Sequence, residues 1–363
     1  MRRVLEMPHR AYDYNCMMSG LESLIEKERG IRFPERLMLL GSFIGFGYER
    51  TTRSDLPRRV QPGSGIGAGQ YAFLAPIFGY AWSSSGGEPF PAAWSALKSL
   101  IDGGVPAILG ELDMFHMPYL RKFYHRIHVP IHYVTLVGYD DERDSALVLD
   151  CGRPTAQEVP LRDLSRAMDV EAFGDSEPNT FYWFDFGDPP KEAASLKIAI
   201  AAVLRRRGAA FLEPADESAG LPALRRLIRE LPQWEKELTP KGCAQCLRHF
   251  ATHTCSAAPM PPQKLVFFPI EEPFRVHQAL RDRFASVLAE VAKTHGLSGC
   301  AEASELFGES GPLFQDVTDR IAEFLAAPIK TRTARRRLAE VPAVLTSIAG
   351  IETRAFTALS RVA

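Results

Sequence analysis

Two apolar segments joined by a short charged turn place the strongest constraint on how this chain folds. The segments HYVTLVGYD and ALVLDCG are apolar and strand-like, and the charged turn DERDS lies between them, so they predict a β-hairpin. If residues 140–144 form the loop, His132 falls opposite a position between 150 and 152, depending on the register. Cross-strand and diagonal neighbours in a hairpin lie roughly 5–8 Å apart. The hairpin therefore predicts that His132 and Asp150 can share a hydrogen bond.

A cysteine opens a second informative segment, far upstream of the hairpin. Cys16 begins the run CMMSGLESLIEKERG, in which apolar residues recur at helical spacing. Gly30 is placed to end this helix, and Asp13 or Asn15 could cap its start. The expected core-facing residues are Met17, Met18, Leu21, Leu24 and Ile25, and the expected solvent-facing residues are Glu22, Glu26, Lys27 and Glu28.

The position of Cys16 suits a nucleophile. Unpaired N–H groups and aligned peptide dipoles at a helix start favour an anion, and a cysteine reacts as its thiolate. His132 would take the thiol proton, and Asp150 would hold the imidazole tautomer. Asp140 and Asp141 are competing carboxylates, but both lie in the turn, where Asp is expected to make local hydrogen bonds. Each residue alone has an ordinary structural explanation, whereas the three together predict acyl transfer through a thioester.

The same residues carry a resemblance to a known family. The stretch PHRAYDYNCMMSGLESLIEKERGIRFPERLMLLGSFIGFGY resembles the N-terminal domain of butirosin biosynthesis protein H and its relatives, which have a Pro-His lead-in, a cysteine-bearing helix and a Gly-rich aromatic segment. The hairpin HYVTLVGYDD…LVLDCG matches the second half of that domain. The later segments EPFRVHQALRDRFASVLAEVA and ELFGESGPLF are similar to the helical domain of unknown function that often follows.

This resemblance implies a papain-like fold and a specific chemistry. The namesake moves an aminoacyl group from a carrier-protein phosphopantetheine thioester to an amine of an aminoglycoside. By motif position the nucleophile maps onto Cys16, the base onto His132 and the orienting acid onto Asp150. Asn15 stands where relatives often have a histidine, and it is a candidate for the oxyanion site or the pocket.

The expected fold class is α+β, in two domains. A papain-like catalytic domain is expected over residues 1–188, with a loop-rich segment at 51–90, and a mainly α-helical domain over 189–363. The step Asp188-Pro189-Pro190 is the boundary candidate, because consecutive prolines continue neither helix nor sheet ladders.

Composition excludes several classes of protein. The chain of 363 residues has 46% hydrophobic and 24% charged residues, which suits about two globular domains. The formal net charge of −1 provides no general field for nucleic acid or an anionic membrane. No secretion signal or membrane-spanning run is expected, and six cysteines without such a signal favour a reducing, cytoplasmic environment.

Two further clusters are candidates for metal or ligand binding. Cys243, Cys246, His249, His253 and Cys255 are dense enough for a structural zinc site, although their spacing is shorter than in standard zinc fingers. An incidental cluster and a redox role are the alternatives.

A loose group of histidines, His116, His125, His128 and His132, precedes and enters the hairpin. Pro130 argues against one helix that would align them on a metal. His125 and His128 are therefore expected to line the substrate pocket rather than to bind a metal.

These observations favour a cysteine-dependent acyltransferase of natural-product biosynthesis that needs no metal or nucleotide. Phosphopantetheine on a partner acyl carrier protein would supply the acyl group, and a small-molecule amine or hydroxyl would accept it. A peptidase- or amidase-type hydrolase with the same triad and a non-catalytic binding module are the alternatives. The basic clusters Arg205–Arg207, Arg225–Arg226 and Arg335–Arg337 are either solvated helix faces or a docking surface for the carrier protein. Assembly as a homodimer is left open.

Overall fold

The computed structural model describes residues 1–11, 16–33, 43–52, 56–63, 68–171, 176–252, 278–327 and 331–363. The chain forms two compact units. The first unit comprises Met1–Ser42, Ile66–Ala199 and Ala258–Val266, and the second comprises Phe43–Gly65, Ile200–Ala257 and Phe267–Ala363. Near the predicted boundary at 188 the chain passes between units at residues 199 and 200, and the segment 43–65 is part of the second unit. Helices and sheet occur together, which confirms the α+β class.

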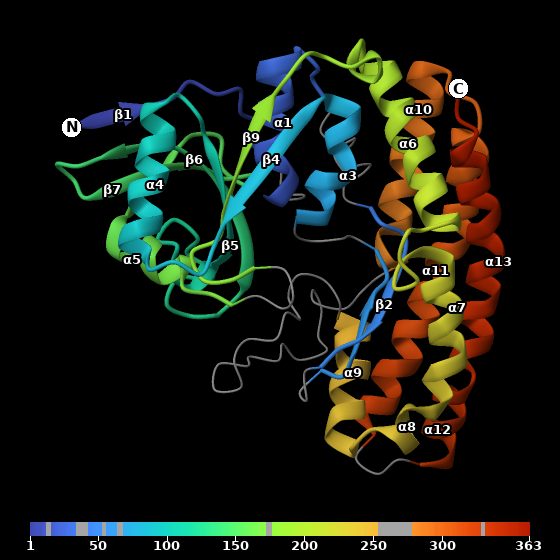
Figure 1. The fold of residues 1–363 in the computed structure, drawn as a ribbon. Coiled ribbons are helices and arrows are strands. Elements are labelled where there is room, and N and C mark those ends of the chain that lie inside the picture. Colours follow the sequence, from blue (N-terminus) through green and yellow to red (C-terminus); the bar gives the residue numbers. More distant parts are fainter. Residues whose placement is uncertain are drawn as a thin grey trace. The chain divides into compact units, whose positions relative to one another are not determined.

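The first unit is built on a seven-stranded antiparallel sheet (Figure 1). Its strand order is β4-β9-β5-β6-β7-β8, and β1 pairs with β6 beside this path. The strands are β1 (Arg2–Val4), β4 (Tyr80–Ser85), β5 (Ala107–Asp113), β6 (Pro130–Asp140), β7 (Ser145–Leu149), β8 (Gln157–Pro160) and β9 (Phe181–Phe186). The helices are α1 (Cys16–Arg29), α3 (Ala68–Phe78), α4 (Phe90–Asp102) and α5 (Leu161–Met168), with 3₁₀ turns η1 (Met114–His116) and η2 (Lys191–Ala193).

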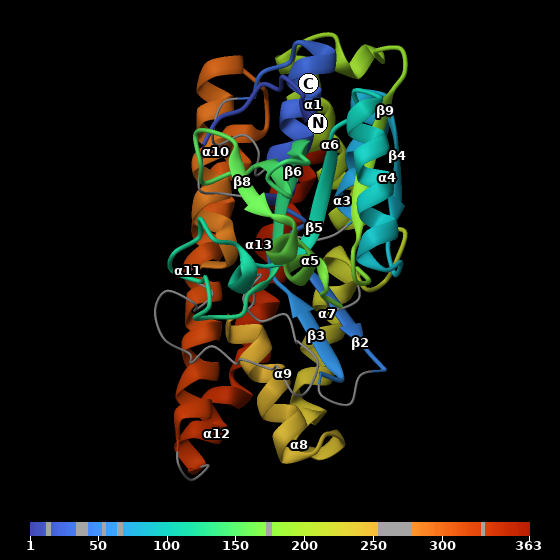
Figure 2. The ribbon, with the colours of Figure 1, turned by 90° about the vertical axis from the view of Figure 1, so that its left-hand side faces the viewer.

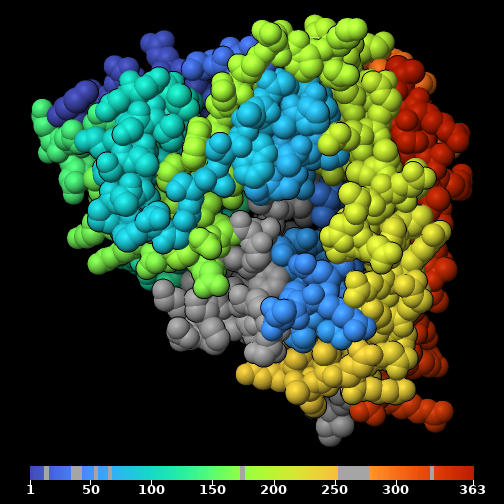
Figure 3. All heavy atoms as spheres, in the orientation of Figure 1, coloured from blue at the N-terminus to red at the C-terminus, as the bar shows by residue number. Residues whose placement is uncertain are grey.

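Helices cover both faces of this sheet (Figure 2). Leu97 of α4 and Leu164 of α5 share a buried apolar cluster with Leu109 of β5. The next residue along β5, Ile108, lies against Gly20 of α1. Because neighbouring side chains of a strand point to opposite faces, α1 lies on the face opposite to α4 and α5. The outer side of α4 is at the surface in Figure 3.

The expectation of a loop-rich segment at 51–90 was wrong. The segment contains β3 (Arg58–Gln61), α3 and β4. Glycine and serine obscured α3 and β4 in the sequence, whereas aromatic residues hold these two elements in the fold. Tyr71 of α3 packs edge-on against Phe184 of β9, at 5.1 Å between ring centroids, and Tyr80 of β4 packs edge-on against the same ring at 5.3 Å.

The second unit is mainly helical and also contains the hairpin of β2 (Gly47–Arg50) and β3. Its helices are α6 (Leu196–Leu212, which begins in the first unit), α7 (Gly220–Glu230), α8 (Trp234–Glu237), α9 (Pro240–Thr252), α10 (Arg281–His295), α11 (Cys300–Ala326), α12 (Arg332–Ala339) and α13 (Val341–Ser360), with 3₁₀ turns η3 (Leu231–Gln233) and η6 (Gln278–Leu280). The long helix α11 packs against α9, α10, α12 and α13. Across the described ranges, no helix combines the length and the apolar character needed to cross a membrane.

A buried ion pair ties the second unit together. Arg281 of α10 and Glu352 of α13 are both fully buried, and two guanidinium nitrogens lie 2.7 and 2.9 Å from the two carboxylate oxygens. Arg281 also donates hydrogen bonds to the carbonyl groups of Gly45 and Pro62, and Ser310 of α11 donates to Glu352. One pair therefore connects the segment 43–63 with three helices of the bundle.

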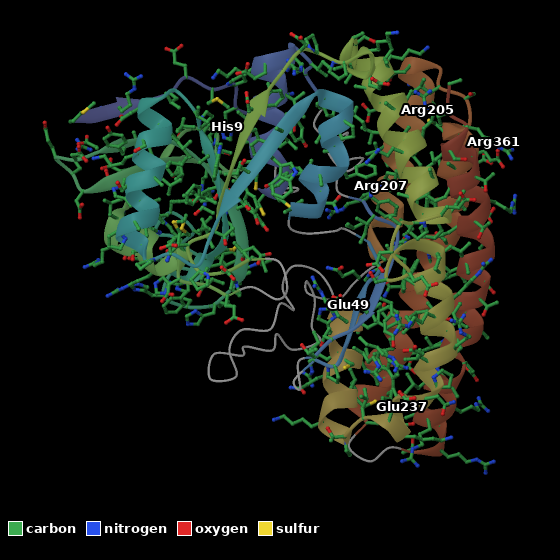
Figure 4. The ribbon with its side chains drawn as sticks, in the orientation of Figure 1. His9, Glu49, Arg205, Arg207, Glu237 and Arg361 are labelled. Carbon is green, nitrogen blue, oxygen red and sulfur yellow. The ribbon has the colours of Figure 1, made fainter. Side chains whose placement is uncertain are left out.

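Smaller ion pairs fasten the β2–β3 hairpin within the second unit. Arg59 lies 3.2 Å from Glu49 on the neighbouring strand, and Arg58 lies 3.1 Å from Glu237 of α8. Both carboxylates are marked in Figure 4 and are well exposed. Such pairs typically contribute no more than about 1 kcal/mol each, so the buried pair matters more for stability.

We expect Glu352→Ala to destabilise the protein by about 3–5 kcal/mol, because it leaves the Arg281 guanidinium buried without its counter-charge. Glu323→Ala is the matched control, since Glu323 forms a partly exposed pair with Arg337 and its loss should cost about 1 kcal/mol or less. Urea unfolding followed by circular dichroism measures both. Equal destabilisation by the two substitutions would contradict the role given to the buried pair.

Candidate functional site

Cys16 is the first residue of α1, as the sequence predicted. The helix ends at Arg29, and Gly30 follows with a φ of +67° and donates its N–H to the Glu26 carbonyl, which confirms its role at the helix end. Cys16 is partly exposed, so its sulfur is at the edge of the buried face. Asp13 and Asn15, the predicted cap and oxyanion candidates, lie outside the described residues.

A glycine sets how closely α1 approaches the sheet. A Cβ atom at Gly20 would lie 2.3 Å from Thr135 Oγ1 of β6 and 2.9 Å from the Ile108 side chain of β5. A larger residue at this position would therefore require the helix or these two side chains to move. Cys16 is four residues before Gly20, on the same side of the helix, and so the close approach also holds the sulfur at the strand ends.

The predicted hairpin is formed by β6 and β7. Asp140 pairs with Ser145 at the turn and Thr135 pairs with Leu149 at the other end, with one irregularity between them. The loop is thus one residue shorter than the 140–144 assumed from the sequence. His132 is near the start of β6 and Asp150 directly follows β7, and His132 Nε2 lies 2.7 Å from Asp150 Oδ2. The predicted hydrogen bond is present.

Two further donors hold the Asp150 carboxylate in place. The Tyr119 hydroxyl donates to Asp150 Oδ2 at 2.6 Å, and the Gly152 backbone N–H donates to Oδ1 at 3.2 Å. Both oxygens of this nearly inaccessible carboxylate are therefore hydrogen-bonded, which lowers the free energy cost of burying its charge. Tyr119 was not predicted from the sequence, because it comes from an irregular stretch with no periodic pattern.

Cys16 Sγ lies near the start of β6, 4.0 Å from the carbonyl oxygen of Ile131, the residue before His132. The Cys16 side chain is close enough to raise the pKa of His132, whereas His132 Nδ1 is buried without a hydrogen-bond partner. Since Nε2 of His132 is used by Asp150, Nδ1 is the ring nitrogen left for the sulfur. Tyr71 of α3 supports the start of α1 by donating its buried hydroxyl to the Met17 carbonyl at 3.2 Å. The structure thus brings Cys16, His132 and Asp150 together in the predicted order.

Electrostatics favour a charged pair at this site. Burial alone would lower the pKa of His132, but the Asp150 carboxylate and then the Cys16 side chain outweigh burial and raise it to about 10. Burial alone would raise the pKa of Asp150, but the charge of His132 and the hydrogen bonds from His132, Tyr119 and Gly152 hold it well below its usual range. His132 is therefore an imidazolium and Asp150 a carboxylate at neutral pH.

The competing carboxylates have other partners. Asp140 Oδ1 accepts hydrogen bonds from the backbone N–H groups of Glu142 and Arg143 within the turn, and Asp141 pairs with Lys98 at 2.6 Å. The lower rank given to both residues is consistent with these contacts.

The core-facing residues of α1 are buried as expected, but one solvent-facing assignment was wrong. Glu22 is only 5% exposed and lies 3.2 Å from the Arg10 guanidinium, which also lies 2.8 Å from Glu26. The helical pattern places Glu22 on the border of the apolar face. Its burial is tolerated because Arg10, which precedes the helix in the sequence, supplies an opposite charge.

The histidine group divides into two parts. His116, His125 and His128 gather around the Phe115 ring, with the His128 ring stacked on it at 3.9 Å between centroids. Asp113 Oδ2 lies 2.5 Å from His128 Nδ1, so this histidine has its own carboxylate partner, separate from the His132 pair. Burial lowers the pKa of His116. A role for His125 and His128 in the substrate pocket stays a prediction.

The Cys/His cluster of the second unit lies partly on α9. Cys243, Cys246 and His249 are buried and recur every three residues, which places them on one side of the helix. His253 and Cys255 lie outside the described residues. Over the ranges that the structure describes, no group of three or more His, Cys, Asp or Glu side chains is arranged to hold a metal. The zinc site stays a prediction.

The basic clusters are not uniformly solvated. Arg207 of α6 is only 4% exposed, whereas Arg205 is exposed and donates to the Val362 carbonyl at 3.0 Å (Figure 4). The arginines of the cluster Arg335–Arg337 on α12 are each within ion-pair distance of a glutamate, as Arg335–Glu235, Arg336–Glu340 and Arg337–Glu323. Much of this positive charge is thus neutralised within the second unit.

Comparison with known proteins agrees with the resemblance found in the sequence. Residues 15–151 match the family model described as butirosin biosynthesis protein H, N-terminal. The matched stretch is less than half of the chain, and it contains Cys16, His132 and Asp150. No curated protein matches the chain.

We expect the His132 interactions to make stability depend on pH. The pKa of His132 is raised from 6.5 to about 10, so its stabilising contribution is complete below pH 6.5 and is lost as the pH rises toward 10. The stability difference between the wild type and His132→Gln should therefore shrink over this interval, with a slope approaching about 1.4 kcal/mol per pH unit. Denaturant unfolding at several pH values measures it. A difference that stays constant from pH 6.5 to 10 would contradict the raised pKa.

We expect Tyr119 to act as a positioning residue through Asp150. Tyr119→Phe removes one donor to the carboxylate, so Asp150 should hold His132 less firmly and the rate of Cys16 alkylation should fall about tenfold. Iodoacetamide labelling of Cys16 across pH, read by mass spectrometry, measures this rate. Tyr124→Phe is the matched control, since the Tyr124 hydroxyl lies 3.5 Å from Asp163 instead. Identical rates for both variants would remove Tyr119 from the site.

Proposed function

We propose, from the match of residues 15–151 to the N-terminal family of butirosin biosynthesis protein H, that this chain is a cysteine-dependent acyltransferase with a papain-like catalytic domain. The acyl donor is a thioester on the phosphopantetheine of an acyl carrier protein. The acceptor is a small-molecule amine or hydroxyl. The name of the matching family supports a biosynthetic setting, and the donor, acceptor and mechanism belong to this proposal.

The observation that carries the proposal is the hydrogen bond between Asp150 and His132, together with the position of Cys16 near that histidine. The carboxylate lies 2.7 Å from one ring nitrogen of His132, and the other ring nitrogen is left to face the sulfur. A nucleophile beside a base that a third group orients is the arrangement that nucleophilic catalysis requires. The partial exposure of Cys16, next to a histidine and a carboxylate that are both buried, is consistent with substrate reaching the sulfur.

The first half-reaction loads the enzyme. The Cys16 thiolate attacks the thioester carbonyl carbon, and the bond from that carbon to the donor sulfur breaks. The departing donor thiolate takes the proton of the His132 imidazolium and leaves as a thiol. An acyl-Cys16 thioester and a neutral imidazole remain. N–H groups at the start of α1 are suited to stabilise the negative charge that develops on the carbonyl oxygen.

The second half-reaction releases the product. The acceptor amine or hydroxyl attacks the acyl-Cys16 carbonyl and gives its proton to His132. The carbon–sulfur bond breaks, the Cys16 thiolate returns beside the imidazolium, and an amide or ester leaves. Exchange between thioesters is nearly balanced in free energy and formation of an amide runs downhill, so the residues need no metal or nucleotide as an energy source.

We expect an acylated protein when the chain is incubated with an acyl-loaded carrier protein. Intact mass spectrometry should show the added acyl group on the wild type and none on Cys16→Ala, because the sulfur is the attacking atom. Cys151→Ala is the matched control, since Cys151 is a buried cysteine of the same unit and its loss should leave the adduct in place. Asp150→Asn should slow adduct formation about 100-fold or more, because the histidine loses the group that orients it.

The fate of the adduct separates the alternatives. Decay only after a primary amine, such as an aminoglycoside, is added and with an amide as the product is the expected result. Decay in water alone at the same rate would make the chain a hydrolase. Absence of any adduct, together with no selective alkylation of Cys16, would make it a binding module and overturn the proposal.

A further inference from the structure

A positively charged recess lies beside the candidate triad in the first unit. Its volume is about 520 Å³, and it is lined by Tyr119, Leu120, Arg121, Lys122, Phe123, Arg153 and Gln157. Three of these residues are cations, and no carboxylate is among them. In the part of the chain that the structure describes, none of the three cations has an ion-pair partner. The recess thus combines uncompensated positive charge with a concave surface.

Two of the lining residues also hold the site together. The Tyr119 hydroxyl bonds to Asp150, and the Arg153 guanidinium donates to the Tyr119 carbonyl at 3.0 Å. The Arg153 carbonyl oxygen in turn lies 2.7 Å from the Nε2 ring nitrogen of His9 (His9 is marked in Figure 4). Arg153 is therefore fixed on two sides, and this wall of the recess is preorganised.

We propose that this recess binds a phosphate group. Arginine and lysine side chains without a carboxylate partner favour an anion, and a guanidinium can donate two parallel hydrogen bonds to phosphate oxygens. Three cations carry more positive charge than a ligand with a single carboxylate would neutralise. A phosphate group carries more negative charge than a carboxylate and is therefore the favoured ligand. Leu120 and Phe123 supply an apolar wall, so the ligand carries a carbon chain or ring beside its phosphate.

The phosphate could come from the phosphopantetheine of the acyl donor, an assignment that rests on the proposed function, or from a free phosphorylated small molecule. The recess is separated from the sulfur by Tyr119, Asp150 and His132. A ligand bound there does not occupy the position of the reacting carbonyl. Its phosphate would instead anchor a molecule that extends from the recess, or bind as an independent ligand.

The test is direct titration of the whole protein with 4′-phosphopantetheine, inorganic phosphate and pantetheine, measured by isothermal calorimetry at low salt. We expect the two phosphate compounds to bind and pantetheine to bind at least tenfold more weakly than 4′-phosphopantetheine. Tighter binding of 4′-phosphopantetheine than of inorganic phosphate assigns the recess to the donor arm. Equal binding of the two excludes the donor arm and contradicts the role given to the apolar wall, leaving a site for the phosphate group alone.

Substitutions that remove positive charge from the recess test whether phosphate binds there. Arg121→Gln/Lys122→Gln should weaken binding of both phosphate compounds at least tenfold while leaving the Arg153 contacts intact. Arg126→Gln is the matched control, because Arg126 is an exposed cation of the same stretch that does not line the recess, and its affinity should stay within twofold of the wild type. No phosphate binding by the wild type, or equal losses in the two variants, overturns the proposal. The titrations involve no turnover, so a failure of acyl transfer leaves their result unchanged.

Discussion

The contact between α1 and the sheet at Gly20 controls the geometry on which the candidate site depends. A Cβ at this position would lie 2.3 Å from the Thr135 side-chain oxygen Oγ1, so a larger residue would require the helix or the sheet side chains beneath it to move. A nucleophile on a helix and a base on a strand keep a fixed separation only when the two elements cannot slide. Because Gly20 allows α1 to pack closely on the sheet, it also sets the position of Cys16 relative to His132.

The second constraint is the free energy cost of burying charged side chains, and the two units meet this cost in the same way. Asp150 accepts hydrogen bonds at both oxygens, and Glu352 meets a guanidinium at both oxygens. In each case neighbouring polar groups donate further hydrogen bonds to the carboxylate oxygens, beyond those of the ion pair itself. A buried ion pair is tolerated when such additional hydrogen bonds are present. The two buried pairs differ in how far they lie from solvent. Arg281 and Glu352 are sealed in a helical core, whereas the Asp150–His132 pair ends at a partly exposed sulfur.

The sequence indicated those parts of the site that local patterns encode. The Cys16 helix follows from apolar spacing and a terminal glycine, and the meeting of His132 with Asp150 follows from counting along one hairpin. Tyr119 could not be found in this way, because its contact with Asp150 joins an irregular stretch to a strand end and depends on the whole fold. The same reason explains the burial of Glu22, whose partner Arg10 precedes the helix. In α3 and β4, small residues concealed elements that long-range aromatic packing stabilises.

The triad alone does not decide between an amine and water as the acceptor, since either can give its proton to an imidazole. Accessibility of the base does bear on the choice. His132 is 4% exposed and Asp150 is 2% exposed, so bulk water has little contact with the nitrogen that must receive the proton. An acceptor held against Cys16 displaces water and brings its own proton to that nitrogen, which gives it an advantage in position over a passing water molecule. In the proposed mechanism, burial of His132 therefore favours transfer over hydrolysis, while the partial exposure of Cys16 leaves its sulfur open to the proposed thioester donor.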